Sequence, residues 1–341
     1  MDVRTILTAL IDKRDLTRDE MLSVMRQIMS GQLTPVQIAG ILVALRAKGE
    51  TVSEISAAAE VMRELSTKVV VADDGHLVDT CGTGGDGRHT FNISTASAFV
   101  AAAAGAKVAK HGGRSVSSTC GSADVLEALG VNVNLSPEQV AQSITEVGLG
   151  FMFAPNHHSA MKHAAPVRRE LSVRTLFNLL GPMTNPAGAK NQVLGVFQCE
   201  LVSIFAQVLK NLGSQHVMVV HGMDGLDEIS ISGDTHVAEL KNAQISEYTL
   251  HPRDFGFAEA LPDALLVQNV EQAQGLLLAV LENQAGAAKN IVCLNAGAAI
   301  YVAGLVPELN QGVAMAEQKI ASGAARAKLD DLVRFTQQCK T

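Results

Sequence analysis

Several features that mark particular classes of protein are scarce or missing in this chain. It contains no tryptophan, and aromatic residues make up 4% of it, so stacking platforms for single-stranded nucleic acid are not expected. Lys and Arg number 27 against 34 Asp and Glu, which gives a net charge of −7. No basic cluster stands out, and we therefore expect no nucleic-acid partner, because such a partner requires a basic stripe.

Cysteines and long apolar runs are sparse as well. The five cysteines are far apart and form no CxxC motif, which is typical of a reducing compartment and argues against disulfides and a zinc ribbon. The two longest uncharged runs, residues 90–106 and 290–307, are interrupted by glycine, asparagine or hydroxyl residues. Neither these runs nor the N-terminus indicates a membrane span or a signal peptide, so we expect a cytoplasmic protein without a membrane partner.

What the chain does contain is a large hydrophobic share, 47% of its residues, which indicates a folded protein with a core. Its length of 341 residues suggests about two domains of roughly 150 residues each. Residues 1–68 are predicted to form a small all-helical domain, in which Thr17, Thr34 and Thr51 begin helices. From residue 69 onward, short β-branched runs alternate with helical patterns. This alternation predicts a large α/β domain over residues 69–341, with a mostly parallel central sheet and helices on both faces.

The expected elements of the α/β part can be given by residue range. Strands are predicted at 69–71, 77–80, 107–110, 148–153, 192–197 and 216–220, and antiparallel strands at 237–240 and 246–250. Helices are predicted at 94–104, 122–129, 136–147 and 201–212, and near 270–282, 288–303 and 309–340.

The densest functional signal is a glycine-rich loop at residues 82–87, which follows a predicted strand and precedes a helix that begins at residues 92–95. Glycine permits positive φ and close approach to a ligand, and the N–H groups of the loop and of the helix N-terminus converge on an anion. The loop is neither a Walker A motif nor a dinucleotide fingerprint. It predicts phosphate binding, with an ordinary sharp turn before a capped helix as the alternative.

A second polar loop follows the strand that ends at Lys110 and runs through His111, two glycines and Arg114 to hydroxyl residues. Lys110 offers a point charge and Arg114 a planar fork, which together suit an anionic, oxygen-rich ligand. A polar surface loop is the alternative interpretation. Because ligands in open α/β sheets bind beyond the carboxyl ends of the strands, two such loops at neighbouring strand ends favour a shared site.

Two further clusters complete the candidate site. Asp227 and Glu228 follow the predicted strand 216–220, and adjacent carboxylates facing phosphate loops suit Mg²⁺, although a solvated acidic turn has the same sequence. His157 and His158 follow the strand that ends at residue 153, but they lack the spacing of a zinc helix. An imidazole together with Arg168 could hold a small carboxylate, and a solvated basic helix is the alternative.

Taken together, these segments resemble the anthranilate phosphoribosyltransferase family. The resemblance covers nearly the whole chain and rests on the helical start and on residues 82–95, 110–130, 153–158, 174–188 and 224–228, in this order. It implies a pyrimidine nucleoside phosphorylase-like fold, in which residues from about 163 to 185 contribute to the helical domain, and a homodimer packed through that domain. It also implies transfer of the phosphoribosyl group of phosphoribosyl pyrophosphate (PRPP) to the amine of anthranilate in tryptophan biosynthesis, with Mg²⁺ as cofactor.

The resemblance also implies roles for individual residues, among which Lys110 and Arg114 are catalytic. The PRPP-binding positions are Gly82, Gly85, Asp86, Thr90, Asn92, Ile93, Ser94, Thr95, Lys110, His111, Gly112, Gly113, Arg114, Ser115, Val116, Ser117, Ser118 and Ser122. The anthranilate-binding positions are Gly82, Gly113, His158, Arg168 and Pro182. The magnesium ligands are Ser94, Asp227 and Glu228.

One position departs from the family pattern. Gly113 stands where the family usually has an asparagine whose amide contacts anthranilate. Because glycine has no side-chain donor, we expect weaker binding of the aromatic substrate or a water in its place. A PRPP transferase for a related aromatic amine is therefore one alternative. A pyrimidine nucleoside phosphorylase-like enzyme is a second, and a nucleic-acid-binding paralogue without activity is a third.

Overall fold

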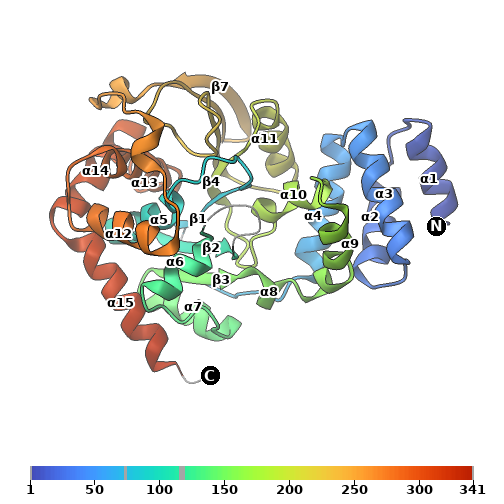
Figure 1. Cartoon of the computed structure of the whole chain (residues 1–341), viewed down its shortest axis with the longest axis horizontal. Coiled ribbons are helices and arrows are strands. Elements are labelled where there is room, and N and C mark those ends of the chain that lie inside the picture. The colour runs from blue at the N-terminus through green and yellow to red at the C-terminus, as the bar shows by residue number, and fades with distance from the viewer. Residues whose placement is uncertain (1, 73–74, 115–119, 340–341) are drawn as a thin grey trace.

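The computed structural model describes residues 2–72, 75–114 and 120–339. Four N-terminal helices form a lobe at one end of the molecule, and most of the remaining chain surrounds a single sheet (Figure 1). The predicted fold class, a helical N-terminal domain followed by an α/β domain with a mostly parallel sheet, is confirmed. Among the described residues, no helix is long and apolar enough to cross a membrane.

The N-terminal lobe is built from locally encoded helices. They are α1 (Val3–Ile11), α2 (Arg18–Met29), α3 (Pro35–Lys48) and α4 (Val52–Leu65). The hydroxyls of Thr17, Thr34 and Thr51 each accept a hydrogen bond from the backbone three residues ahead, which satisfies an otherwise unpaired N–H. The three helix starts that the sequence predicts at these threonines are therefore confirmed.

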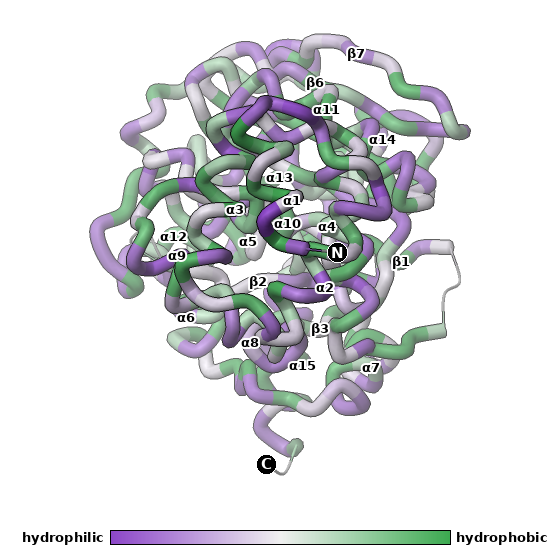
Figure 2. Tube along the Cα trace, turned by 90° about the vertical axis from the view of Figure 1, so that its right-hand side faces the viewer, coloured by the Kyte–Doolittle hydropathy of each residue, from purple (hydrophilic) through white to green (hydrophobic). Residues whose placement is uncertain are grey.

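A later segment of the chain packs against this lobe. Its elements are α8 (Ala154–His157), α9 (Ala165–Leu171), α10 (Leu176–Leu180) and the 3₁₀ helices η1 (Ser159–His163) and η2 (Gly181–Met183). Helix α9 lies against α3, and α10 lies against α4. The buried side chains of the lobe, of α9 to α11 and of one sheet face form one hydrophobic cluster, so the lobe is joined to the sheet by continuous apolar packing. Figure 2 looks onto the lobe, where hydrophobic and hydrophilic stretches alternate along the helices.

In the part of the chain that the structure describes, the sheet has seven strands in the order β3-β2-β1-β4-β5-β6-β7. The strands are β1 (Leu77–Gly82), β2 (Lys107–Gly112), β3 (Leu149–Phe153), β4 (Asn191–Gly195), β5 (His216–Gly222), β6 (Thr235–Lys241) and β7 (Gln244–Leu250). The first five are parallel, whereas β6 and β7 are antiparallel. Because β1 lies between β2 and β4, the strand order reverses beside it, and open α/β sheets bind ligands at such a reversal.

Helices cover both faces of the sheet. They are α5 (Ile93–Ala104), α6 (Ser122–Ala128), α7 (Pro137–Glu146), α11 (Leu201–Asn211), α12 (Val270–Leu281), α13 (Ala287–Val302), α14 (Leu309–Ala321) and α15 (Ala324–Gln338), with 3₁₀ helices η3 (Pro252–Phe255) and η4 (Pro262–Leu265). Along β4, Val193 belongs to the core of α5 and α13, whereas the next residue, Leu194, belongs to the core shared with the helical lobe. This alternation is the period of two that a strand covered on both faces requires.

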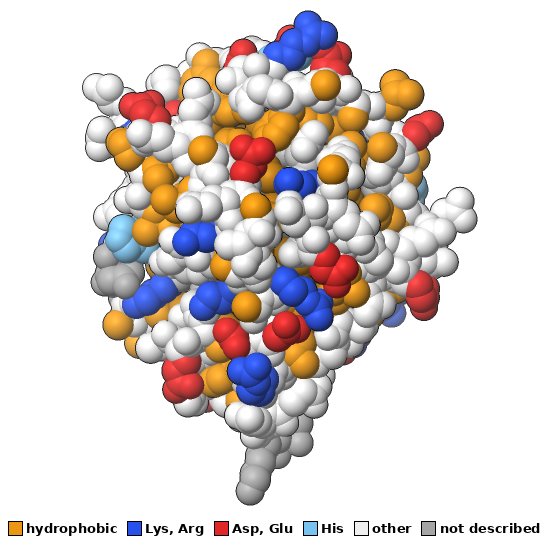
Figure 3. All heavy atoms as spheres, turned by 90° about the vertical axis from the view of Figure 1, so that its left-hand side faces the viewer, with side chains coloured by type: hydrophobic (Ala, Val, Ile, Leu, Met, Phe, Trp, Pro, Cys, Tyr) orange, Lys and Arg blue, Asp and Glu red, His pale blue; other side chains and the backbone are white. Residues whose placement is uncertain are grey.

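The outer surface of the α/β domain, on the side away from the lobe, carries charge of both signs. Figure 3 looks onto this face, where acidic and basic side chains are interspersed with one another and with hydrophobic ones. Among its described residues, this face therefore carries no large patch of a single charge sign.

Two sequence predictions of secondary structure are wrong in detail. Residues 69–71 form no strand. The N–H of Val69 donates to the carbonyl oxygen of Pro186 at 3.1 Å, and the side chain of Val70 faces outward with 85% of the residue exposed. The predicted helix at 309–340 is two helices, α14 and α15, separated at Gly323, whose φ of +75° is a left-handed value that glycine adopts readily.

Candidate active site

The polar loops singled out from the sequence meet at the carboxyl edge of the parallel strands. Strand β1 leads into the glycine loop, defined here as residues 82–87, and α5 begins shortly afterwards. Strand β2 ends next to it with the second polar loop, and β5 ends in the turn that carries Asp227 and Glu228. The parallel arrangement of these strands places all three segments at one edge of the sheet.

The glycine loop has a backbone shape that other residues adopt only with strain. Gly84 and Gly85 have φ values of +65° and +75°. The N–H of Gly84 donates to Oδ2 of Asp227 at 2.8 Å. A Cβ on Gly82 would collide with the Asp227 carboxylate, and one on Gly195 would collide with the Asp227 backbone. The loop and the acidic turn are therefore in direct contact, and glycine is what permits it.

The acidic pair lies beside the N-terminus of α5. Oε1 of Glu228 accepts a hydrogen bond from the backbone N–H of Ser94 at 3.1 Å, a position that the helix dipole favours for a negative charge. Burial raises the pKa of Glu228 to about 7. Burial, with the nearby Asp86 and Glu228 carboxylates, raises the pKa of Asp227 well above its ordinary value. Crowded carboxylates whose ionised forms are destabilised in this way are stabilised by a bound cation.

These donors fit magnesium held jointly by protein and substrate. Across residues 2–72, 75–114 and 120–339, no three His, Cys, Asp or Glu side chains are arranged as a ready metal cage. Magnesium commonly takes one or two carboxylates and completes its shell with water and substrate phosphate oxygens. Asp227 and Glu228 lie beside Ser94, as an incomplete set of this kind requires.

Lys110 is a buried cation between the sheet and α5. Its side chain is 3% exposed, and Nζ donates to the carbonyl oxygen of Thr80 at 2.6 Å and to Oγ of Ser94 at 3.1 Å. Burial lowers the pKa of Lys110, whereas the neighbouring carboxylate of Asp79 raises it. Ser94 thus contacts Lys110 through its hydroxyl and Glu228 through its N–H, so the two polar loops and the acidic turn share one place.

Several buried polar atoms at this edge lack a hydrogen-bond partner within the described structure. They are Oδ1 of Asn92, Oγ1 of Thr95 and Oγ1 of Thr175, together with Nε2 of His111 and of His158. Asn92 uses its amide nitrogen on the carbonyl oxygen of Cys120 at 3.1 Å, which leaves its oxygen unpaired. Buried polar atoms are normally paired, so a cluster of unpaired ones indicates a ligand that completes them.

The two histidines form a neutral wall. The ring centres of His111 and His158 lie 5.0 Å apart. Burial lowers the pKa of His111 to about 3 and that of His158 to about 4, so both imidazoles are uncharged at neutral pH. Neutral imidazoles next to apolar side chains can contact an aromatic ring and still offer one hydrogen bond each.

Two of the expected anthranilate residues, Arg168 and Pro182, lie in the segment that packs against the helical lobe. Arg168 on α9 is partly buried, and its guanidinium carbon lies 5.5 Å from the ring centre of Phe177. Burial lowers the pKa of Arg168. Pro182 is buried in η2, and its carbonyl oxygen accepts a hydrogen bond from Gln192 at 2.6 Å. Among the described residues, which leave out 115–119, no atom lies within 4 Å of a Cβ added at Gly113.

Other expected PRPP residues, at the end of β2 and the start of α6, contact one another and neighbouring side chains. Arg114 forms ion pairs with Asp124 at 3.0 Å and with Glu127, so its guanidinium group is already paired with two carboxylates of α6. Oγ of Ser122 donates to the carbonyl oxygen of Gly113 at 3.4 Å. A Cβ on Gly112 would collide with Ser122.

The remaining expected PRPP positions lie before and in the first turn of α5, or outside the described residues. Thr90 forms an isolated bridge with Leu266, and Ile93 is buried in the first turn of α5. Ser115, Val116, Ser117 and Ser118 lie outside the described residues.

Sequence reasoning gave no role to two residues that the structure places at the site. Asp79 is fully buried in β1, and its Oδ1 accepts a hydrogen bond from the N–H of His111 at 3.3 Å. Arg174 donates to the carbonyl oxygen of Gly85 in the glycine loop. Asp79 sits inside a strand pattern and Arg174 among several basic residues, so only their three-dimensional neighbours distinguish them.

Comparison with known proteins agrees with this geometry. Residues 4–66 match the helical bundle domain of a glycosyl transferase family, and residues 74–326 match the a/b domain of such a family. An anthranilate phosphoribosyltransferase of Thiobacillus denitrificans is 63% identical over 334 residues, which are 98% of this chain and 97% of that protein.

Solved structures extend the comparison. The anthranilate phosphoribosyltransferase of Thermus thermophilus has a TM-score of 0.92 and 44% identity, covering 97% of this chain and 99% of that one. The enzyme of Saccharomyces cerevisiae, solved in complex with PRPP and Mg, has a TM-score of 0.89 and 26% identity, covering 99% and 98%. The chain belongs to the anthranilate phosphoribosyltransferase family, within the glycosyl transferase family that both of its domains match.

Proposed function

We propose that this chain transfers the phosphoribosyl group of PRPP to the amine of anthranilate and releases pyrophosphate. The observation that carries the proposal is made at the strand reversal, where the glycine loop contacts Asp227 while Lys110 and Glu228 both contact Ser94. Backbone N–H groups and a buried cation suit a diphosphate, and buried carboxylates suit the cation that accompanies it. The family relatives support the same reaction.

The chemistry places mainly electrostatic demands on the protein. As the bond between the anomeric carbon and the pyrophosphate oxygen breaks, the sugar becomes positively charged and the leaving group gains negative charge. Lys110 and the loop N–H groups after Gly84, together with the helix dipole of α5, are fixed in advance and would stabilise that charge without rearrangement. Asp227, Glu228 and Ser94 would hold Mg²⁺, which neutralises the diphosphate when bound. The anthranilate amine attacks as a neutral nucleophile, and the proton that its nitrogen loses passes to water or to the released pyrophosphate, so we nominate no general base.

The acceptor side would be formed by Arg168, His158, His111 and Pro182. A guanidinium in partly buried surroundings pairs well with a carboxylate, which anthranilate carries next to its amine. The two neutral imidazoles would line the ring without adding charge. Holding the amine in line with the anomeric carbon makes the reaction effectively intramolecular, which supplies a large part of the rate enhancement.

The direct test mixes purified protein with PRPP, anthranilate and Mg²⁺ and follows pyrophosphate release together with loss of anthranilate fluorescence. We expect both signals in equal amounts, and we expect Glu228→Gln to lose most of the activity while remaining folded. Phosphorolysis of thymidine or uridine, assayed in parallel, would instead identify a nucleoside phosphorylase. Absence of pyrophosphate release by folded wild-type protein would contradict the proposal.

A related aromatic amine is a second candidate acceptor because Gly113 has no side chain to contact the acceptor. If the chain accepts ring-substituted anthranilates, the ratio of their kcat/KM values to that of anthranilate should fall in Gly113→Asn. The asparagine side chain would add an amide donor at this position. An unchanged ratio would remove this position from the specificity argument.

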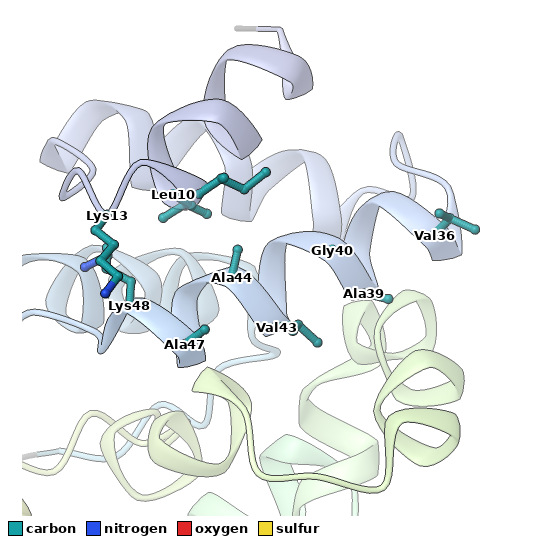
Figure 4. Close-up of a pocket in the computed structure, with 10 residues that line it drawn as sticks. Leu10, Lys13, Val36, Ala39, Gly40, Val43, Ala44, Ala47 and Lys48 are labelled. Atoms are coloured by element: carbon teal, nitrogen blue, oxygen red, sulfur yellow. The ribbon is translucent and has the colours of Figure 1, made fainter.

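We also propose that the chain forms a homodimer through its helical lobe. An apolar groove of about 590 Å³ runs between α1 and α3, with Val36 near one end and Lys13 and Lys48 near the other (Figure 4). Ile11, Val36 and Val43 line it and expose 72%, 81% and 46% of their surface. Exposed apolar side chains that are clustered in this way mark an interaction surface.

The occupant that we propose is a second copy of the chain. Light scattering should give twice the 35.9 kDa chain mass for the wild type and the chain mass for Val36→Asp with Val43→Asp. A monomeric wild type at micromolar concentration would contradict the dimer. The cytoplasmic location stays a prediction from the sequence.

A further inference from the structure

Arg174 contacts the glycine loop from the helical side of the site. It lies between α9 and α10, and its guanidinium donates a hydrogen bond to the carbonyl oxygen of Gly85. A Cβ on Gly85 would lie 3.4 Å from Nη2 of Arg174, so the side chain approaches the loop backbone closely. The guanidinium carbon also lies 4.0 Å from the ring centre of Phe197, within the range of a cation–π contact.

Phe197 is itself tied to the same loop. It follows the end of β4, and its backbone N–H donates to Oγ1 of Thr83 at 3.1 Å. The N–H of Thr83 in turn donates to the carbonyl oxygen of Gly195 at 2.9 Å. These contacts link residues 83 and 85 of the loop through two side chains, and we call them the loop brace. Thr83 accepts a hydrogen bond from the Phe197 backbone, the Phe197 ring packs against the Arg174 guanidinium, and Arg174 donates to the Gly85 carbonyl oxygen.

The brace fixes the direction of one peptide group. The peptide between Gly85 and Asp86 is trans, and a trans peptide points its C=O and its N–H in opposite directions. Because Arg174 holds the Gly85 carbonyl, the Asp86 N–H points away from Arg174. Two residues before Asp86, the N–H of Gly84 donates to Oδ2 of Asp227. Glycines at positive φ have wide conformational freedom, so these two contacts determine which way the loop presents its N–H groups.

We propose that Arg174, held in place by Phe197, is a positioning residue that presets the glycine loop to bind the diphosphate of PRPP. This inference rests on the function proposed above. It requires the shape of arginine as well as its charge, because a planar guanidinium stacks on a ring and donates at the same time. Lysine offers the charge without the planar fork.

The test compares the KM for PRPP, the KM for anthranilate and kcat in Arg174→Ala, Arg174→Lys, Phe197→Leu and the double variant Arg174→Ala with Phe197→Leu. We expect Arg174→Ala to raise the KM for PRPP roughly tenfold, as for loss of one hydrogen bond from a charged donor. The KM for anthranilate and kcat should stay within about twofold. Arg174→Lys should not restore the KM, and Phe197→Leu should raise it no further in the Arg174→Ala background.

The matched control is Arg169→Ala, an exposed arginine on α9 in the same basic stretch, which should leave all three constants unchanged. Circular dichroism melting of each variant shows whether it is folded. The inference is overturned if Arg174→Ala leaves the KM for PRPP unchanged, if lysine restores it, or if the two substitutions act additively. A wild type without transferase activity would instead contradict the proposed function.

Discussion

Replacing Lys110 by methionine tests the electrostatic core of the site, because methionine keeps the length and the apolar stem of the side chain and removes its charge and donors. The ammonium donates to Thr80 at 2.6 Å and to Ser94 at 3.1 Å from a position that is 3% exposed. Preorganised donors that face developing charge typically contribute about 10²–10³ in kcat. We expect a loss of that size for Lys110→Met, measured as pyrophosphate release at saturating PRPP.

The stability change should be small by comparison. Loss of two hydrogen bonds from a charged donor costs about 3 kcal/mol or more. Burial disfavours the charged form of Lys110, as its lowered pKa indicates, so removing the charge offsets part of that cost. A net loss of about 1–2 kcal/mol in the free energy of unfolding, measured with urea, would follow.

The control for this prediction is Lys107→Met, the same substitution at the opposite end of β2. It should leave kcat unchanged, because residue 107 lies at the edge of the sheet away from the candidate site. If folded Lys110→Met turned over within threefold of the wild type, the assignment of Lys110 to the leaving group would be refuted.

Three further substitutions probe the loop, the acid response and the lobe. Gly82→Ala should raise the KM for PRPP roughly tenfold, since its Cβ would collide with the Asp227 carboxylate and overpacking costs about 1–3 kcal/mol; unchanged kinetics would contradict the observed contact. His158 has a pKa of about 4 when folded and near 6.5 when unfolded, so the unfolded chain binds the additional proton and stability falls as the pH drops from 6.5 toward 4. His158→Asn should therefore lose about 2 kcal/mol less than the wild type between about pH 7.5 and 5, as measured by urea unfolding at both pH values, whereas an equal loss would show that His158 does not titrate in this way. Glu54 is fully buried and accepts hydrogen bonds from Leu16, Thr51 and Lys48, so Glu54→Gln should lower the free energy of unfolding by about 3 kcal/mol, and a change below about 1 kcal/mol by the same method would contradict the pairing.

Local sequence rules predicted the elements and the main loops of the site. Helix starts at Thr17, Thr34 and Thr51 are encoded within four residues, so their prediction needs no tertiary information. The meeting of the glycine loop with Lys110 and Glu228 follows from one further rule, that parallel strands end at the same edge. Residues 69–71 were predicted wrongly because β-branched residues favour strands only where a partner strand pairs with them.

Contacts between distant segments were beyond these rules. The sequence suggests that the Arg114 guanidinium is available to bind phosphate. In the structure, Asp124 and Glu127 lie one helical turn apart on α6 and form ion pairs with it. Arg174 meets Phe197 and Gly85 only because α10 and β4 are brought beside the loop by the shared core. Propensity and periodicity describe neighbours along one element, and these residues lie on different elements.

A crystal structure of the chain with PRPP and Mg²⁺ tests the central claim most directly. We predict the diphosphate against the glycine loop and the N-terminus of α5, with Lys110 beside it and with Asp227 and Glu228 facing the cation. Electron density for PRPP at another surface, with Glu228 and Lys110 touching neither the sugar diphosphate nor the metal, would contradict the account.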